Sequence, residues 1–178
     1  DGWVIDGSKL FITNGVYGDV YIVAARTDPQ ARGSRGLSLF IVDKGTPGFN
    51  VLRRIPMLGG HSTYEVAFED CRVPATQMLG QEGKGFAPMQ ARLSSRRVEM
   101  AAKCIGRAQR ALDMICEYAP QRSTFGAKLS ERQAIQWWVA DAATKIHACR
   151  LMTYEAAARI DRGEEARTQV SMIKVFAT

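Results

Sequence analysis

Histidine and cysteine are scarce in this sequence, and they are spread too far apart to suggest a metal site. The 178 residues include two histidines, His61 and His147, and four cysteines that form no CxxC pair. A structural zinc site needs about four such ligands at short spacings, so none is expected. Scattered cysteines without a signal peptide are typical of a reducing compartment. We therefore expect a cytoplasmic location, or the mitochondrial matrix in a eukaryote.

Long apolar runs and the common nucleophile and nucleotide motifs are also missing. No stretch of about 18 consecutive apolar residues occurs, so no membrane span is expected. The sequence contains no recognisable Ser-His-Asp or Cys-His arrangement and no P-loop. The glycine-rich segment 80–85 precedes a predicted helix, where anions can bind, but its spacing matches neither nucleotide fingerprint. We interpret that segment as a turn between domains.

The composition is that of an ordinary globular protein, with 46% hydrophobic and 24% charged residues. A net charge of +6 is compatible with a phosphate-bearing ligand but does not identify one. The first residues, up to Trp3, have the pattern of a turn that leads into a strand. The last residues, around Phe176, lie in an apolar periodic run with no glycine or proline to end the helix. We therefore expect an internal piece of a longer protein.

Residues 1–80 have the pattern of an antiparallel β-domain. Short runs rich in β-branched and aromatic residues alternate with turn dipeptides, and no helical periodicity separates them. Asp6-Gly7 predicts a hairpin turn, and Asn14-Gly15 predicts a second turn. This pattern favours a barrel or a sandwich. The predicted strands cover residues 3–5, 9–13, 19–27, 37–42, 49–55 and 64–73.

One long helix is predicted from about residue 85 to residue 118, with an apolar face beside a basic face. Arg97 is the exception, because it projects into the apolar sector. A guanidinium there either extends to water or finds a buried partner, and the sequence leaves both open. Glu99 and Asp113 lie on the polar side, where Glu99 is expected to pair with Lys103. The apolar face comprises Phe86, Leu93, Met100, Cys104, Ala108, Ala111 and Ile115, and the basic face Arg92, Arg96, Lys103, Arg107 and Arg110.

A second helix is predicted over residues 130–162, and a third from Glu164 onward. Ser130 and Gln133 fit a capping box at the start of the second helix. Trp137 and Leu151 lie roughly opposite its main apolar face, so this helix is apolar on two sides. Residues 81–178 are therefore expected to form a helical bundle with a subunit interface.

Four strings follow one another along the chain. Residues 6–15 read DGSKLFITNG, residues 68–74 FEDCRVP, residues 79–86 LGQEGKGF, and residues 122–126 RSTFG, with Gln133 seven residues beyond Gly126. The first resembles the G-x-K-x-W-I-T-N-G strand of acyl-CoA dehydrogenases. The next two resemble that family's link from middle to C-terminal domain, and the last is similar to its R-x-x-F-G…Q signature. The resemblance covers essentially the whole chain.

The resemblance implies an α+β fold: an antiparallel β-barrel domain over residues 1–80, followed by an incomplete helical bundle over residues 81–178. It also implies a flavoprotein oxidoreductase of fatty acid metabolism. Such an enzyme uses FAD to dehydrogenate an acyl-CoA thioester between its α and β carbons, and it passes the electrons to an electron-transfer flavoprotein. The partners implied are thus acyl-CoA, that flavoprotein, and further copies of the chain in a homodimer or homotetramer.

The resemblance also assigns cofactor positions. The Thr13 hydroxyl would bond the flavin near N5, and the aromatic ring of Phe11 would flank the flavin. Arg122 would pair with the FAD pyrophosphate of a neighbouring subunit. The capping-box interpretation of Gln133 competes with its role beside the cofactor. The full set of FAD-binding positions is Phe11, Ile12, Thr13, Arg122, Ser123, Thr124 and Gln133.

The substrate side departs from the family pattern. Arg97 matches the arginine of an L-D-x-x-R string near the acyl thioester, but Ser94 stands where that string has aspartate. Some members carry a catalytic glutamate just before this arginine, where the chain has Arg96, which cannot act as a base. Most members carry the base in a later segment. The catalytic base is therefore unidentified and expected beyond Thr178. Phe11 replaces the family's tryptophan and lacks its indole donor.

A rival interpretation is a non-enzymatic binding module. Its basic helix face would hold an anionic partner such as a nucleic acid. That face is interleaved with acids and lacks the stacking aromatic residues that single-strand binders use. The sequence therefore favours the enzyme and no nucleic-acid partner.

Overall fold

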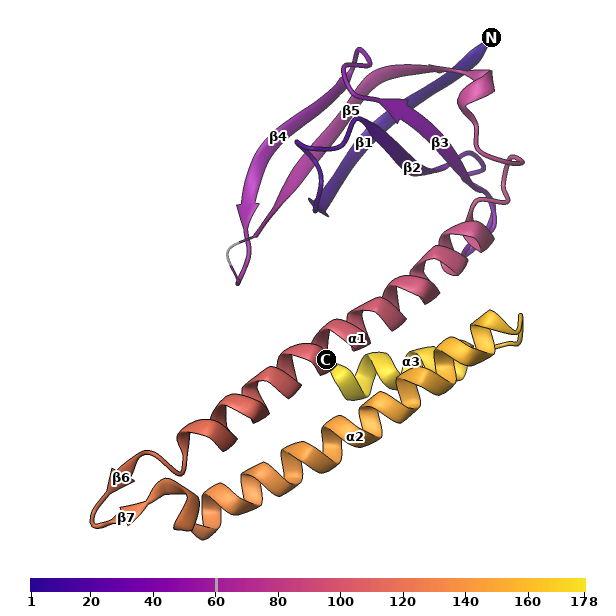
Figure 1. The fold of residues 1–178 in the computed structure, drawn as a ribbon. Helices are drawn as coiled ribbons and strands as arrows, with labels where there is room; N and C mark the ends of the chain where they lie inside the picture. Colours follow the sequence, from indigo (N-terminus) through magenta and orange to yellow (C-terminus); the bar gives the residue numbers. More distant parts are fainter. Residues whose placement is uncertain (60) are drawn as a thin grey trace. The chain divides into compact units, whose positions relative to one another are not determined.

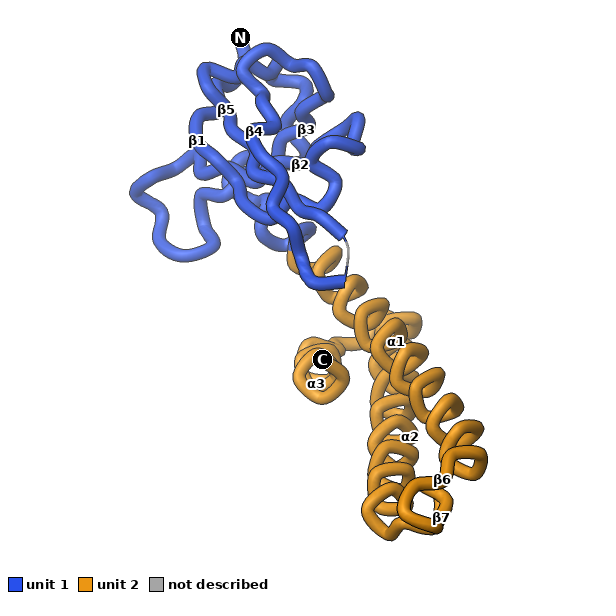
Figure 2. The backbone as a smooth tube through the Cα atoms, turned by 90° about the vertical axis from the view of Figure 1, so that its left-hand side faces the viewer, with its two compact units in different colours: residues 1–89 blue, residues 90–178 orange. Residues whose placement is uncertain are grey.

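The computed structural model describes residues 1–59 and 61–178, which form two compact units, Asp1–Met89 and Gln90–Thr178 (Figure 2). The first unit holds five strands, and the second holds most of the helical residues (Figure 1). None of the described helices is both long enough and apolar enough to span a membrane. The strands are β1 (Gly2–Ile12), β2 (Val20–Arg26), β3 (Leu37–Asp43), β4 (Phe49–Pro56), β5 (Ser62–Pro74), β6 (Ser123–Thr124) and β7 (Ala127–Lys128), and the helices are α1 (Phe86–Tyr118), α2 (Gln133–Asp161) and α3 (Arg167–Ala177).

The first unit is built from two antiparallel sheets. One sheet has the order β1-β5-β4, and the other pairs β2 with β3. Apolar side chains from both sheets gather in a common core, in which Phe40 and Val42 of β3 are almost fully buried. Burial of such side chains is the main stabilising contribution to the unit. The core comprises Ile5, Val23, Phe40, Val42, Val66, Phe68, Cys71 and Val73.

The expected closed barrel is wrong, because the sheets remain open. A barrel needs every strand paired on both sides, whereas among the described residues β2 pairs only with β3 and β1 only with β5. At the unpaired edge of β1, the ammonium group of Lys9 donates a hydrogen bond to the Ala24 carbonyl of β2 at 2.9 Å. A side chain thus joins the two strands at this point in place of a backbone ladder.

The hairpin predicted at Asp6-Gly7 is also wrong, because β1 runs unbroken through both residues. The register shifts from Ile5 opposite Cys71 to Gly7 opposite Phe68, so β5 carries one extra residue. That bulge holds Asp70 at φ +46°, and the Asp6 carboxylate accepts its backbone N–H at 2.8 Å. Asp6 therefore satisfies an amide that the bulge leaves unpaired.

The glycine-rich segment before α1 runs along β3. Leu79 donates its N–H to the Leu39 carbonyl, and Gly85 donates to the Leu37 carbonyl, both at 2.8 Å. The buried Ser38 hydroxyl oxygen accepts the N–H of Gly83 at 2.8 Å and lies 2.8 Å from the Thr27 hydroxyl oxygen. These bonds fix the first residues of α1 against the first unit.

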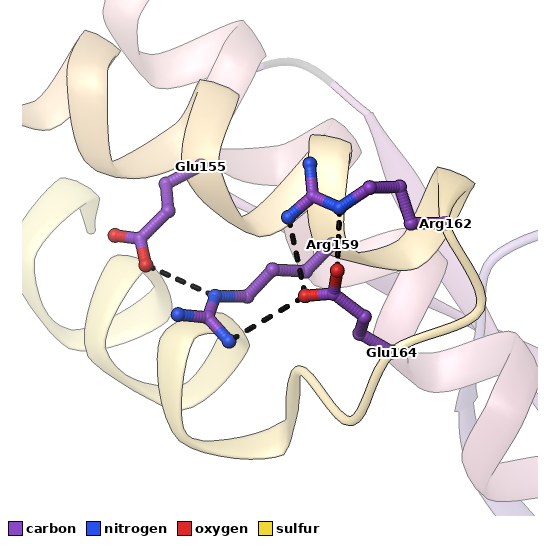
Figure 3. Close-up of polar contacts among 4 residues, drawn as sticks. All are labelled: Glu155, Arg159, Arg162 and Glu164. Carbon is purple, nitrogen blue, oxygen red and sulfur yellow. Dashed lines mark hydrogen bonds and ion pairs between the residues drawn. The ribbon is translucent and has the colours of Figure 1, made fainter.

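The long helix is confirmed within one residue, but the second and third helices begin later than predicted. α2 begins at Gln133, after a 3-10 turn over Leu129–Glu131, and α3 begins at Arg167. Glu164 precedes α3 because its carboxylate is engaged in the turn: it pairs with Arg162 and lies 3.7 Å from Arg159, which in turn pairs with Glu155 at 3.0 Å (Figure 3). The hydrogen bonds from Arg162 lower the pKa of Glu164.

The second unit has its own core, centred on alanine side chains. Ala101 of α1 and Ala156 of α2 are fully buried, together with Ile173 of α3. The distance between packed helices depends on the side chains at their contact, so alanines allow a close approach. The predicted apolar face of α1 is confirmed in part: Ala108, Ala111 and Ile115 line an apolar pocket together with residues of α2, whereas Leu93 and Met100 remain 41% and 44% exposed.

Gly48 and Gly45 offer a matched test of the first unit, because both have φ +85°. A Cβ on Gly48 would lie 2.3 Å from the Glu69 carbonyl oxygen, whereas a Cβ on Gly45 would meet nothing within 4 Å. Gly45→Ala should cost about 1 kcal/mol of unfolding free energy, from backbone strain alone. Gly48→Ala should cost at least about 1 kcal/mol more because the backbone must shift. Urea unfolding of both variants measures the difference, and equal midpoints would contradict the close approach.

Candidate functional site

A second bulge, at the end of β1, turns Phe11 outward. Lys9 lies opposite Val66 and Ile12 lies opposite Tyr64, so β1 carries one extra residue between them. Phe11 has φ +61° and is 59% exposed. A positive φ is rare for an aromatic residue, and it persists only where the surrounding structure imposes it. The bulge therefore holds an aromatic ring at the surface, against both backbone preference and burial.

The residues that follow Phe11 differ in their surroundings. Ile12 is half-buried and packs against the core of the first unit. Thr13 is exposed, and its hydroxyl makes no hydrogen bond with the other described residues. An apolar ring beside an available hydroxyl donor suits a flat heteroaromatic ligand, such as an isoalloxazine ring.

Tyr21 of β2 fixes the loop after Thr13, a role that the sequence analysis missed. Its hydroxyl lies 3.0 Å from the Gly15 carbonyl oxygen and 2.8 Å from that of Gly18, and donates toward both. Its ring packs on Phe49 with centroids 4.6 Å apart. Burial raises the pKa of Tyr21, so the hydroxyl stays protonated. No sequence pattern links this tyrosine to carbonyls of a loop several residues before it.

In the second unit, four predicted residues lie on one short segment. β6 and β7 form a hairpin whose two turn residues, Phe125 and Gly126, have φ +51° and +74°. Positive φ at both positions defines a type I′ turn. Backbone bonds close the base of the hairpin, from Leu129 N–H to the Arg122 carbonyl at 2.8 Å and from Ser130 N–H to the Ala119 carbonyl at 3.1 Å. We call residues 122–133 the hairpin segment.

The hairpin segment leaves its polar side chains available. Arg122 and Ser123 are exposed, and neither side chain forms a hydrogen bond or ion pair within the described residues. Thr124 is half-buried, and it receives hydrogen bonds from Arg132, a residue that the sequence analysis did not name. A planar guanidinium without a carboxylate partner is suited to a phosphate.

The capping-box interpretation of Gln133 is wrong. α2 has Arg132 at its N-cap position with no side-chain cap, and Gln133 is exposed. The acidic side chain that closes this turn is that of Glu131, which accepts the N–H of Lys128 at 3.4 Å. The Gln133 side chain is therefore not engaged by the backbone, and the ligand role remains its only predicted one.

Ser94 and Arg97 lie near each other on α1, one turn apart and both half-buried. The Ser94 hydroxyl donates to the Gln90 carbonyl at 3.1 Å. Arg97 makes no hydrogen bond or ion pair with the other described residues, and its neighbour Val98 packs against the alanine core. Arg97 thus lies beside the apolar face with an uncompensated charge.

Two of the three acids of α1, Glu99 and Asp113, are occupied by other partners, and the third, Glu117, is exposed near the end of the helix. Glu99 pairs with Arg96 and, at 3.4 Å, with Arg92, so the predicted pairing with Lys103 is wrong. Asp113 accepts a hydrogen bond from the Gln109 amide at 2.9 Å. The single carboxylate of Glu99 thus contacts two of the five basic residues of the predicted basic face and balances the charge of one. None of the three acids of α1 forms an ion pair with Arg97 in the described part of the chain.

Both parts of the chain match known domains. Residues 1–71 match the acyl-CoA dehydrogenase middle domain, and residues 83–178 match the acyl-CoA dehydrogenase C-terminal domain. The chain therefore belongs to the acyl-CoA dehydrogenase family.

Relatives of known identity support this membership. Cyclohex-1-ene-1-carbonyl-CoA dehydrogenase of Geobacter metallireducens is 42% identical over 181 residues, covering 100% of this chain and 47% of that protein. Butyryl-CoA dehydrogenase of Megasphaera elsdenii has a solved structure similar at TM-score 0.92 and 38% identity, covering 99% of this chain and 46% of that chain. A structure of PigA with FAD and proline is similar at TM-score 0.93 and 34% identity. The match covers 98% of this chain and 46% of that chain. The chain spans about half the length of these proteins.

Two substitutions of Phe11 separate its ring from its backbone conformation. Phe11→Gly relieves the positive φ, whereas Phe11→Ala retains it. The glycine variant should be more stable than the alanine variant by about 1 kcal/mol, since alanine is strained in this region. Thermal unfolding of the two variants measures the difference. Equal stability would show that the bulge relaxes when the ring is removed.

Proposed function

We propose that this chain is the middle and C-terminal part of an FAD-dependent acyl-CoA dehydrogenase. The enzyme dehydrogenates an acyl-CoA thioester between its α and β carbons and passes the electrons to an electron-transfer flavoprotein. The observation that carries the proposal is the surface at the end of β1. There an exposed aromatic ring, held at positive φ, precedes the available hydroxyl of Thr13 by two residues.

The first unit supplies one wall for the flavin. Phe11 packs its ring on the isoalloxazine, and Thr13 donates a hydrogen bond near N5. Ile12 anchors the strand by packing into the core, so both flanking residues are held in place. When bound, FAD supplies the hydride chemistry and the chain supplies its orientation and electrostatic surroundings.

The second unit supplies groups for the phosphates. Arg122 pairs with the pyrophosphate, and Ser123, Thr124 and Gln133 lie along the same cofactor. In the family arrangement, Arg122 serves the flavin of a neighbouring subunit, so the proposal includes a homodimer or homotetramer. The solved relative containing FAD supports the cofactor assignment.

On the substrate side, Arg97 and Ser94 lie near the acyl thioester. The uncompensated guanidinium of Arg97 suits a partly negative thioester oxygen. The base that removes the α-proton is expected in a later segment of the whole protein, as in most members of the family, because none of the three acids of α1 forms an ion pair with Arg97 in the described part of the chain. The names of the relatives, which act on different acyl-CoA thioesters, support the substrate class without fixing the acyl group.

Arg122 tests the cofactor assignment directly. In the whole protein, Arg122→Ala should weaken FAD binding by about tenfold to hundredfold, because a charge-assisted contact to phosphate is lost. Unfolding of the flavin-free protein should hardly change, since the Arg122 side chain has no partner within the described residues. Titration of the apoprotein with FAD measures the affinity.

Arg107→Ala is the matched control, because Arg107 is also exposed and forms no hydrogen bond or ion pair with the described residues. It should retain full FAD affinity. Equal flavin affinity in the Arg122 variant and the wild type would refute the assignment, whatever the control shows.

The chain by itself should be inactive. It lacks a recognised base within reach of an α-proton. Trp137 and Leu151 are 61% and 55% exposed on α2, which leaves apolar surface that promotes association. The isolated chain should therefore be colourless, self-associate, and fail to reduce a dye acceptor with acyl-CoA. Stoichiometric FAD together with acyl-CoA-dependent dye reduction would contradict this expectation.

A further inference from the structure

The hairpin segment gathers three positive charges in a short stretch of chain. Arg122, Lys128 and Arg132 all belong to it, and none forms an ion pair with any described residue. Its acid, Glu131, is used by the backbone N–H of Lys128. With Glu131 counted, the three cations and one acid leave the segment a net charge of +2 (3 − 1), which favours an anionic ligand.

Arg132 differs from the other two cations because its guanidinium is already bonded within the segment. Its Nη2 donates to the Thr124 carbonyl and also to the Thr124 hydroxyl oxygen, the latter at 3.2 Å. Arg132 is half-buried at the N-cap position of α2, where its backbone is extended. It thus reaches back from the helix to the first strand of the hairpin.

The bond to the hydroxyl has a direction. A threonine hydroxyl carries one hydrogen and accepts through its lone pairs. Because Arg132 donates to this oxygen, the hydrogen of Thr124 points elsewhere, and it has no acceptor among the described residues. A neighbouring positive charge also polarises the hydroxyl and makes it a stronger donor. Thr124 is therefore presented as a donor and not as an acceptor.

We propose that Arg132 is a positioning residue for the cofactor. It aligns the Thr124 hydroxyl as a hydrogen-bond donor to a phosphate oxygen of FAD, while Arg122 supplies the ionic contact. The inference rests on the proposed function, because it names a further determinant of the same cofactor site. It assigns Arg132 no contact of its own with the cofactor.

A double-mutant cycle in the whole protein tests whether Arg132 acts through Thr124. Arg132→Met and Thr124→Val should each weaken FAD binding by about tenfold, since each removes the same aligned donor. The double variant should also weaken binding by about tenfold, and not by the hundredfold that independent effects would give. Thr124→Ser keeps a hydroxyl and should bind FAD as the wild type does.

Arg107→Met is the control for loss of a positive charge and should leave FAD affinity unchanged. If Arg132→Met fails to fold by circular dichroism, Arg132→Ala takes its place in the cycle, because alanine also removes the donor to Thr124. Additive effects, or full FAD affinity after substitution of Arg132, would overturn the positioning role. A wild-type protein that binds no FAD would instead refute the proposed function, and the inference with it.

Discussion

The register between β1 and β5 determines what the first unit presents at its surface. Successive side chains of a strand face opposite sides, so a slip of one residue would exchange core and surface positions. Two bulges interrupt this register, one on each strand, at Asp70 and near Phe11. Ile5 enters the core before the first irregularity, and Ile12 packs against it after the second. The exposed ring of Phe11 exists only because the extra residue of β1 is accommodated between these two anchors.

Much of this fold could be predicted from the sequence because its signals are local. The runs that became β2 to β5 are bounded by turn residues, and α1 has a long helical period, so their existence and type were predictable. The positions of Arg122 and Thr124 came from the resemblance of residues 122–126 to the family's R-x-x-F-G signature, and their role at the cofactor stays a prediction. The open sheets could not be predicted, because whether β1 pairs with β2 depends on packing across the core. Asp6-Gly7 has the composition of a turn, yet both residues lie within β1. There the Asp6 carboxylate accepts a hydrogen bond from the Asp70 amide of β5.

The missed residues have one property in common: their partners are determined by tertiary geometry. The Tyr21 hydroxyl bonds carbonyl groups of a preceding loop, and the Arg132 guanidinium donates hydrogen bonds to Thr124 in the first strand of the hairpin. Neither arrangement has a characteristic spacing. The predicted apolar face of α1 was incomplete for a similar reason, since Ala101, which is buried in the core of the second unit, contributes little to a hydrophobic pattern. In this chain, small or polar side chains therefore carry structural information that hydrophobic periodicity does not capture.

The hydrogen bonds between segment 78–85 and β3 determine where this protein can be divided. With glycine at positions 80, 83 and 85, the segment has the composition of a flexible tether, but it makes two isolated bridges to β3, Met78 with Phe40 and Lys84 with Leu37. Cleavage at residue 80 would leave the Leu37 carbonyl and the Ser38 hydroxyl without the donors they now receive. A protease would need to open that edge before cutting there. An excised β-unit should therefore retain the chain through Gly85, because Gly83 and Gly85 donate hydrogen bonds to β3.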